Sequence, residues 1–314
     1  MPNSFSRFLS DEDLAKVRED YLAALAEVEL DAQAGPQHPV ITPDDPAALS
    51  VPGQQPEPQY AASHRHICVA GLQLDRFWHC FGTERHSVTL DLIVQLLHAS
   101  GTNVLPINTH QLDDRRQRSA LEHGFAGATY DALGTRIDLS RYVKMLNINL
   151  RTCAEQAVTA AKIAVEMTGE RVIKLEVLEP ALRDSRDLDV VAAARQLINW
   201  EPSLVVLPLI SCSIDAANAA MEAGCPLLRV MGSAISSGRG ITDPAAFTRI
   251  CQRPIPVVLD GGIGQTTDID DAVQLGANGV LINSVLFDTG QAPVSVMQDF
   301  AAAARKAFQR ALIT

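Results

Sequence analysis

Residues 256–283 read PVVLDGGIGQTTDIDDAVQLGANGVLIN. Two short apolar runs of strand length, 256–260 and 279–283, lie on either side of a stretch with helical apolar spacing at 267–275. A strand, a helix and a second strand in this order form a βαβ unit, whose two strands lie parallel. The segment therefore predicts a parallel sheet that is covered by helices.

The same alternation extends back to about residue 64. After a hairpin expected at 66–75, strands are predicted at 77–82, 103–108, 143–149, 172–178, 204–210, 227–231, 256–260 and 279–283. Helices are predicted at 87–100, 153–168, 188–200, 213–223, 244–252, 267–275 and 294–311. Eight such repeats over roughly 250 residues match the α/β fold class of the (β/α)8 TIM barrel. A doubly wound sheet is the alternative, although no G-x-G-x-x-G follows the first strand.

The first 63 residues differ from the rest of the chain. Ser10 and Asp13 form a capping-box-like pair, and the apolar spacing that follows predicts an amphipathic helix over 10–30. Seven of the seventeen prolines lie between Gly35 and Tyr60, which argues against regular structure there. We therefore divide the chain into an N-terminal helix with a Pro-rich linker at 1–63 and a barrel catalytic domain at 64–314.

Composition excludes several classes of function. The 37 acidic and 26 basic residues give a net charge of −11, so the basic surface needed for binding nucleic acid is missing. No apolar run reaches the length of about 18 residues that a membrane-spanning helix needs. The six cysteines show no C-x-x-C pair, which is typical of the reduced thiols of a cytoplasmic protein. A small anionic substrate stays compatible with the negative charge because backbone N–H groups can bind it locally.

The expected strand at 172–178 carries two charged residues. Ile173, Leu175 and Val177 share one aliphatic face, which suits the helix layer, so Lys174 and Glu176 should point into the barrel. Burial lowers the pKa of a lysine, and a neutral amine can attack a carbonyl to form an imine, or Schiff base. The alternative is an interior ion pair with no chemistry.

Further candidate residues follow the last two strands. Asp260 ends the strand 256–260, where a second acid or base is expected, although a residue that braces the loop is the alternative. The glycines after it expose backbone N–H groups, and Asn283-Ser284 follows the eighth strand. Loops at these two places commonly bind phosphate in such barrels, so a phosphorylated substrate is favoured. The loop 232–240, with Arg239 as an anion contact, either closes over the ligand or is a surface loop.

No metal or cofactor is predicted. His64, His66, His79 and His86 lie close together in the sequence, but no carboxylate or thiol spacing completes a metal site. The motifs of phosphate-binding P-loops, zinc proteases and serine hydrolases do not occur in the sequence.

Several motifs, taken in order, resemble bacterial thiazole synthase of thiamine biosynthesis. They are VIKLEV at 172–177, VLP at 206–208, GSAISSGRGI at 232–241, VVLDGGIG at 257–264 and LGANGVLIN at 275–283. The similarity covers about residues 66–310.

The resemblance implies a transferase that forms a Schiff base between Lys174 and the ketone of 1-deoxy-D-xylulose 5-phosphate. Glu176 and Asp260 would transfer protons, and Gly261, Gly262, Asn283 and Ser284 would bind the phosphate. Sulfur would come from the C-terminal thiocarboxylate of a ubiquitin-like sulfur carrier protein, and condensation with dehydroglycine would give thiazole phosphate. The family also implies a homo-oligomer.

The chain departs from the family pattern at several positions. A stretch containing two Asp residues after strand five becomes 209–213, LISCS, and a Pro-Asn-Thr segment becomes Asn147-Ile-Asn149. Ser236, which we place among the substrate contacts, replaces a glycine. The family's C-terminal tail is expected to be missing after Thr314.

These departures leave other functions open. Sulfur insertion into another phosphosugar, in a thiosugar or natural-product pathway, is one alternative. A lysine-imine aldolase or isomerase that needs no carrier is a second alternative. A non-catalytic phosphosugar-binding barrel is the third.

Overall fold

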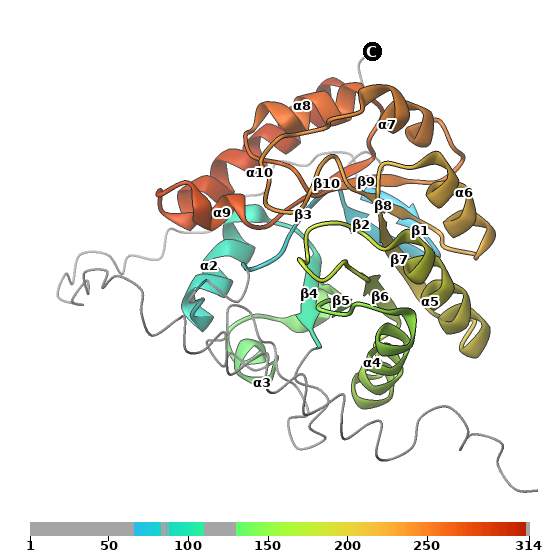
Figure 1. Ribbon diagram of the computed structural model, residues 1–314. Helices are drawn as coiled ribbons and strands as arrows, with labels where there is room; N and C mark the ends of the chain where they lie inside the picture. Colours follow the sequence, from blue (N-terminus) through green and yellow to red (C-terminus); the bar gives the residue numbers. More distant parts are fainter. Residues whose placement is uncertain (1–65, 83–85, 87, 110–129, 312–314) are drawn as a thin grey trace, which may run out of the picture. The chain divides into compact units, whose positions relative to one another are not determined.

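The computed structural model describes residues 66–82, 86, 88–109 and 130–311 of the chain. Eight parallel strands form its centre, in the order β3-β10-β9-β8-β7-β6-β5-β4 (Figure 1). Their bounds are β3 Phe77–His79, β4 Val104–Asn108, β5 Val143–Ile148, β6 Val172–Leu175, β7 Val205–Ile210, β8 Leu228–Val230, β9 Val257–Asp260 and β10 Gly279–Ile282. Each predicted strand is present, most of them one or two residues shorter than expected.

The order of the strands identifies the fold as a TIM barrel. Neighbouring strands follow each other along the chain, β10 pairs with β3 in register Val280 to Phe77, and β3 lies against β4, so the sheet closes almost completely on itself. The doubly wound alternative is wrong, because such a sheet reverses its strand order at a switch point and this sheet does not. The predicted fold class is confirmed.

Helices lie outside the barrel between the strands (Figure 1). Their bounds are α2 Leu90–Ser100, α3 Tyr130–Gly134, α4 Ala154–Thr168, α5 Asp187–Trp200, α6 Ile214–Glu222, α7 Pro244–Cys251, α8 Thr267–Gln274, α9 Val285–Asp288 and α10 Pro293–Arg310, with a 3-10 turn η3 at Leu139–Arg141. The seven helices predicted between residues 87 and 311 are present. The sequence pattern missed α3, η3 and α9, because elements of three to five residues are too short to show a helical period.

Local signals set the helix ends. The side chain of Thr89 accepts the backbone N–H of Leu92 at 3.2 Å and caps the start of α2. Gly101 ends the same helix at φ 63°, in the left-handed region where glycine has no steric penalty. At α7, Asp243 accepts the N–H of Ala246 at 2.9 Å, and Pro244 occupies the first turn.

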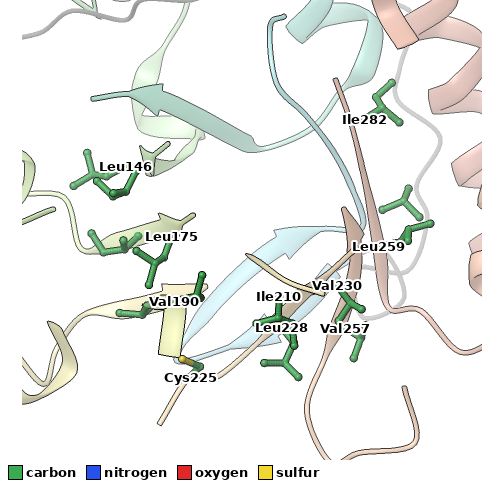
Figure 2. Close-up of a cluster of buried hydrophobic side chains, with 14 of the residues drawn as sticks. Leu146, Leu175, Val190, Ile210, Cys225, Leu228, Val230, Val257, Leu259 and Ile282 are labelled. Atoms are coloured by element: carbon green, nitrogen blue, oxygen red, sulfur yellow. The ribbon is translucent and has the colours of Figure 1, made fainter. Parts of the chain in front are cut away.

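Two apolar layers stabilise the barrel. The outward faces of the strands pack against the helices, and Figure 2 shows this layer with Leu146, Leu175, Ile210, Val230 and Leu259 among its members. The second layer lies inside the barrel and includes Met145, Val172, Leu207, Val258 and Leu281. Because successive strand residues alternate between the two layers, polar interior positions stand out clearly from the helix-facing ones.

An antiparallel hairpin, predicted at 66–75, joins the interior layer. Its strands are β1 His66–Val69 and β2 Leu72–Asp75. Ile67, Val69 and Leu74 belong to the same buried cluster as the interior strand residues. Asp75 exchanges two hydrogen bonds with Asn103, just before β4, so the hairpin lies at the amino ends of the strands.

The expected helix at 10–30 and the Pro-rich linker up to residue 63 lie outside the described residues, and this division of the chain stays a prediction. Within the described ranges, no helix combines the length and apolar character needed to cross a bilayer.

Candidate active site

A cavity of about 150 Å³ opens at the carboxyl ends of the strands. Seven of the eight residues predicted for the site line it, namely Lys174, Glu176, Asp260, Gly261, Gly262, Asn283 and Ser284. They come from β6, β9 and β10 and from the loops that follow these strands. The parallel barrel thus brings together residues that are up to 110 positions apart, Lys174 to Ser284, as the sequence analysis predicted.

Lys174 and Glu176 point into the barrel, as the alternation of β6 predicts. Lys174 is 3% exposed, and its Nζ donates to Asn147 Oδ1 at 3.1 Å and to Glu176 Oε1. Glu176 lies just after the end of β6 at Leu175. Beyond it the chain folds back, and the backbone N–H of Arg186 donates to Val177 O at 2.9 Å. The strand is therefore shorter than predicted. An interior ion pair is present, and it lies at the wall of a cavity.

Arg229 is a central residue of this network that the sequence analysis missed. It lies on β8, is fully buried, and bridges the two carboxylates. Its Nη2 lies 2.6 Å from Glu176 Oε1, and its Nε donates to Asp260 Oδ2 at 2.7 Å. A charged residue inside an apolar strand is the signal that identified Lys174, and the same signal is present in LLRVM at 227–231.

Asp260 is part of this network and does not cap a helix. Asp268 is the residue that braces the following loop, because its Oδ2 accepts the backbone N–H groups of Gly264 at 2.8 Å and Gln265 at 3.0 Å. These two N–H groups are therefore occupied, although the sequence suggested that the whole loop was open to a ligand. Gly261, Gly262 and Ile263 form the part of the loop that lines the cavity.

The ionisation of the lysine differs from the sequence-based expectation. Burial, the largest influence, and the neighbouring Arg229 lower the pKa of Lys174. Cys80, Glu176 and Asp260 raise it by more, so the pKa of Lys174 lies above its ordinary value. The expected neutral amine is thus wrong for Lys174 in this network, because the sequence could not show how many carboxylates surround the lysine.

Glu176 is held as a carboxylate in the same network. Burial alone would raise the pKa of Glu176. The charges of Lys174 and Arg229, together with their hydrogen bonds, lower it by more, so the pKa of Glu176 lies below its ordinary value. The resting site therefore holds an ammonium group beside an ionised carboxylate.

The glycines that follow Asp260 have a steric role. Gly261 and Gly262 have φ angles of 109° and 91°. A Cβ on Gly262 would lie 2.7 Å from Gly240 O, so no larger residue fits without movement of the backbone. After the neighbouring strand β10, Asn283 Oδ1 accepts the N–H of Gly82 at 2.7 Å, which fixes this side chain.

Ser236 is the one of these eight residues that does not line the cavity, and Arg239, considered as an anion contact, is exposed and does not line it either. Ser236 is exposed and has a φ angle of 60°, in the left-handed region, whereas its neighbour Ile235 lines the cavity. The loop is docked on its surroundings. Gly240 N donates to Gly262 O at 2.7 Å, and Ile235 N donates to Arg183 O at 2.9 Å.

Further cavity residues were not selected from the sequence. Cys80, Asn108 and Asn149 line the cavity beside Lys174. Burial raises the pKa of the Cys80 thiol. The Oδ1 atom of Asn149 is buried and has no hydrogen-bond partner among the described residues. A buried acceptor left unpaired costs about 1–3 kcal/mol, which a ligand hydroxyl would relieve.

The histidines that were considered as metal ligands have other partners. His66 lies 3.3 Å from Asp75, and His86 lies 3.5 Å from Asp288. His79 is buried, with its Nε2 3.0 Å from Ser100 Oγ, and burial lowers its pKa to about 4. His64 lies outside the described residues. In the ranges described, no three His, Cys, Asp or Glu side chains are arranged to hold a metal.

Comparison with known proteins agrees with the motif resemblance. A thiazole synthase from Exiguobacterium sibiricum is 32% identical over 208 residues, which cover 65% of this chain and 75% of that protein. A thiazole synthase from Geobacillus thermodenitrificans is 30% identical over 204 residues, covering 63% and 73%.

Solved structures match the fold as well. The Amycolatopsis orientalis BexX/CysO complex contains a chain that is 27% identical, with a TM-score of 0.67, covering 77% of this chain and 93% of that one. The thiamine phosphate pyrophosphorylase from Pyrococcus furiosus, 12% identical with a TM-score of 0.50, shows the fold alone. The family model described as "Thiazole biosynthesis protein ThiG" matches residues 81–312. The chain therefore belongs to this family, the thiazole synthases of thiamine biosynthesis.

Proposed function

We propose that this protein forms an imine between Lys174 and the ketone of 1-deoxy-D-xylulose 5-phosphate or a related phosphoketose, and then introduces sulfur from a thiocarboxylated carrier protein to make thiazole phosphate. The observation that carries the proposal is the position of the Lys174 amine in the cavity wall, between Asn147 and Glu176. A buried lysine that lies beside a carboxylate in a cavity is the arrangement that carbonyl chemistry requires.

The imine step starts from the ammonium form of Lys174. Lys174 first transfers a proton to Glu176, and the free amine adds to the ketone carbon. The carboxyl group returns this proton to the alkoxide oxygen, which gives the carbinolamine. Glu176 then carries a second proton from the carbinolamine nitrogen to its hydroxyl group, which leaves as water. The product iminium carries the same single positive charge as the starting ammonium, so the charge balance of the buried network is preserved. Asp260 is the second group available for later proton transfers.

The phosphate of the sugar would lie at the opposite wall. Gly261, Gly262, Asn283 and Ser284 line that side, and the glycine loop brings backbone close to the cavity. Backbone N–H groups bind phosphate without a basic side chain, which agrees with the acidic composition of the chain.

The sulfur donor is proposed from the family and from one solved structure. BexX, 27% identical to this chain, was crystallised in a complex with CysO. A chain with a similar fold thus occurs in a complex with a second protein, and we extend this to a ubiquitin-like sulfur carrier protein for the present chain. The expected homo-oligomer also rests on the family.

A second candidate substrate is favoured by the polar wall of the cavity. Asn108 and Asn149 add carboxamide groups beside Lys174, and Asn149 Oδ1 is without a partner among the described residues. Such groups suit a sugar phosphate with additional hydroxyls, as in sulfur insertion into another phosphosugar.

The test is to trap the imine. Purified protein is incubated with 1-deoxy-D-xylulose 5-phosphate and, separately, with pentose and hexose phosphates, and borohydride is added. The mass increase should map to the peptide that carries Lys174. Lys174→Ala should lose the adduct while its far-ultraviolet circular dichroism stays that of the wild type. Lys162→Ala, a helix lysine stacked on Trp200, is the matched control and should keep the adduct.

Other outcomes separate the alternatives. Sugar-phosphate binding that survives Lys174→Ala, without any adduct in the wild type, would indicate a binding barrel. Turnover of the sugar without a thiocarboxylated carrier would indicate an aldolase or isomerase. The sugar that is trapped most efficiently distinguishes thiazole formation from another phosphosugar pathway.

A further inference from the structure

Arg229 occupies the interior of the barrel below the cavity and does not line it. Its three guanidinium nitrogens all have partners within the barrel. Nε and Nη2 contact the two carboxylates, and Nη1 donates to the carbonyl oxygens of Leu207 at 3.3 Å and Leu175 at 3.4 Å. A fully buried arginine with every nitrogen paired has a fixed position, so it can act on the site only through the groups it holds.

The charges in this network balance. Lys174 and Arg229 supply two positive charges, and Glu176 and Asp260 supply two negative charges. The charge on Arg229 is permanent, whereas the charge on Lys174 disappears when its amine attacks a carbonyl. During that step the proton is on Glu176, and Arg229 is the remaining cation, in contact with the carboxyl group of Glu176 and the carboxylate of Asp260.

Arg229 holds one oxygen of each carboxylate. It contacts Oε1 of Glu176 and Oδ2 of Asp260, and the Lys174 amine also uses Oε1. Among the described residues, Oε2 of Glu176 and Oδ1 of Asp260 have no hydrogen bond, and neither is among the fully buried unpaired atoms. Both residues line the cavity, so a ligand can reach the second oxygen of each.

We infer that Arg229 is a positioning residue for the imine chemistry. By binding one oxygen of Glu176 and one of Asp260, it fixes both side chains, favours the ionised form of Glu176, and presents the second oxygen of each to the cavity as two separate bases. The inference rests on the proposed function and specifies how the site holds Glu176 and Asp260 in place while the proton of Lys174 is on Glu176.

The electrostatic surroundings agree with this role. The groups that face Glu176 are Lys174 from the same strand, Arg229 from β8, Asp260 from β9 and Cys80 after β3. Arg229 lowers the pKa of Glu176 and also lowers the pKa of Lys174. Removal of the positive charge should therefore raise both pKa values, so the whole pH profile of imine formation should move to higher pH.

The experiment compares Arg229→Gln, which keeps hydrogen-bond donors without charge, with Arg229→Lys, which keeps the charge without the planar fork. The rate of borohydride-trapped adduct formation on Lys174 is measured against pH. Arg229→Gln should move the midpoint up by about 1–3 pH units, the usual effect of an adjacent opposite charge. Arg229→Lys should leave the midpoint in place and lower the rate. An unmoved midpoint in Arg229→Gln, with a rate lowered equally at every pH, would overturn the inference.

A measurement without substrate separates this inference from the proposed function. The carboxylate infrared band of Glu176, assigned by the difference from Glu176→Gln, is followed through a pH titration. The wild type should keep Glu176 ionised below its ordinary range, and Arg229→Gln should protonate it at higher pH. If wild-type Glu176 titrates at or above its ordinary pKa range, the inference fails, whether or not the imine is trapped. This result needs only the wild type and Glu176→Gln, so it holds even if Arg229→Gln does not fold. If no imine forms but Glu176 titrates as expected, the proposed function fails.

Discussion

Arg229 Nε lies 2.7 Å from Asp260 Oδ2, on two adjacent strands in the barrel interior. Loss of one partner of a buried ion pair costs about 3–5 kcal/mol, because the other charge is left uncompensated. We expect Arg229→Met and Asp260→Asn each to lower the free energy of unfolding by about this amount.

The double variant Arg229→Met, Asp260→Asn should lose less than the sum of the two single variants, with an interaction energy of about 0.5–3 kcal/mol. Urea unfolding of the four proteins measures this cycle. Strictly additive losses would show that the two side chains stabilise the barrel independently of each other.

Protonation of His79 should weaken the fold in mild acid. Its pKa is about 4 in the folded protein against an ordinary value of 6.5, because burial disfavours the charged imidazole. The unfolded chain therefore binds a proton first as the pH falls. The contribution of His79 is fully present above about pH 6.5 and is lost, by about 3 kcal/mol in total, as the pH falls to about 4.

The check is urea unfolding at several pH values for the wild type and His79→Gln. The slope between pH 6.5 and 4 should be smaller in His79→Gln. His98→Gln, on the exposed side of α2, controls for the loss of an imidazole. Equal slopes in wild type and His79→Gln would contradict the prediction.

Ser236 should carry backbone strain. A residue with a Cβ at φ 60° costs roughly 1 kcal/mol relative to glycine. Ser236→Gly and Ser236→Ala both remove the hydroxyl, but only glycine removes the strain, so Ser236→Gly should be the more stable of the two by about 1 kcal/mol in thermal unfolding.

The same pair of variants tests the substrate contact that the sequence predicts for Ser236. Because the side chain is outside the cavity, both variants should trap the sugar as the wild type does. Equal loss of the adduct in both variants would show that the hydroxyl contacts the substrate.

A substitution of Asn149 should weaken ligand binding without lowering the stability of the protein. Because its Oδ1 is unpaired among the described residues, Asn149→Leu loses no acceptor contact there, and the free energy of unfolding should stay the same or rise, by at most the roughly 1–3 kcal/mol that the unpaired acceptor costs. Binding of the trapped sugar phosphate should weaken at least about tenfold, the effect of one lost hydrogen bond of roughly 1.4 kcal/mol.

Asn147→Leu is the matched comparison, because Asn147 accepts a hydrogen bond from Lys174. It should lower both stability and adduct formation. Unchanged sugar binding in Asn149→Leu, measured by calorimetry, would rule out a hydroxyl contact at that residue.

The features that could be predicted from the sequence are those that depend on the regular spacing of apolar residues along the chain. The alternation of Ile173, Lys174, Leu175 and Glu176 indicated which side chains enter the barrel, because a strand has a side-chain period of two. The eight repeats indicated a closed sheet, which placed Asp260 and Asn283 at the same end as Lys174.

What the sequence could not show depends on contacts between strands. Arg229 gains its role from Glu176, 53 positions away, and only the curvature of the barrel brings them together across β7. The raised pKa of Lys174 reflects the sum of several neighbouring charges. The exposure of Ser236 depends on how its loop docks on Gly262 and Arg183.

The hairpin of β1 and β2 has a consequence for the order of events. Its apolar side chains fill the barrel at the amino ends of the strands. Within the described residues, a substrate therefore reaches Lys174 past the loops at the carboxyl ends. The proposed sugar and the proposed protein donor of sulfur would then use the same opening of the cavity. If the proposed sugar binds beneath the proposed carrier protein, the sugar has to bind before the carrier and its product has to leave after it, so this architecture predicts an ordered binding sequence.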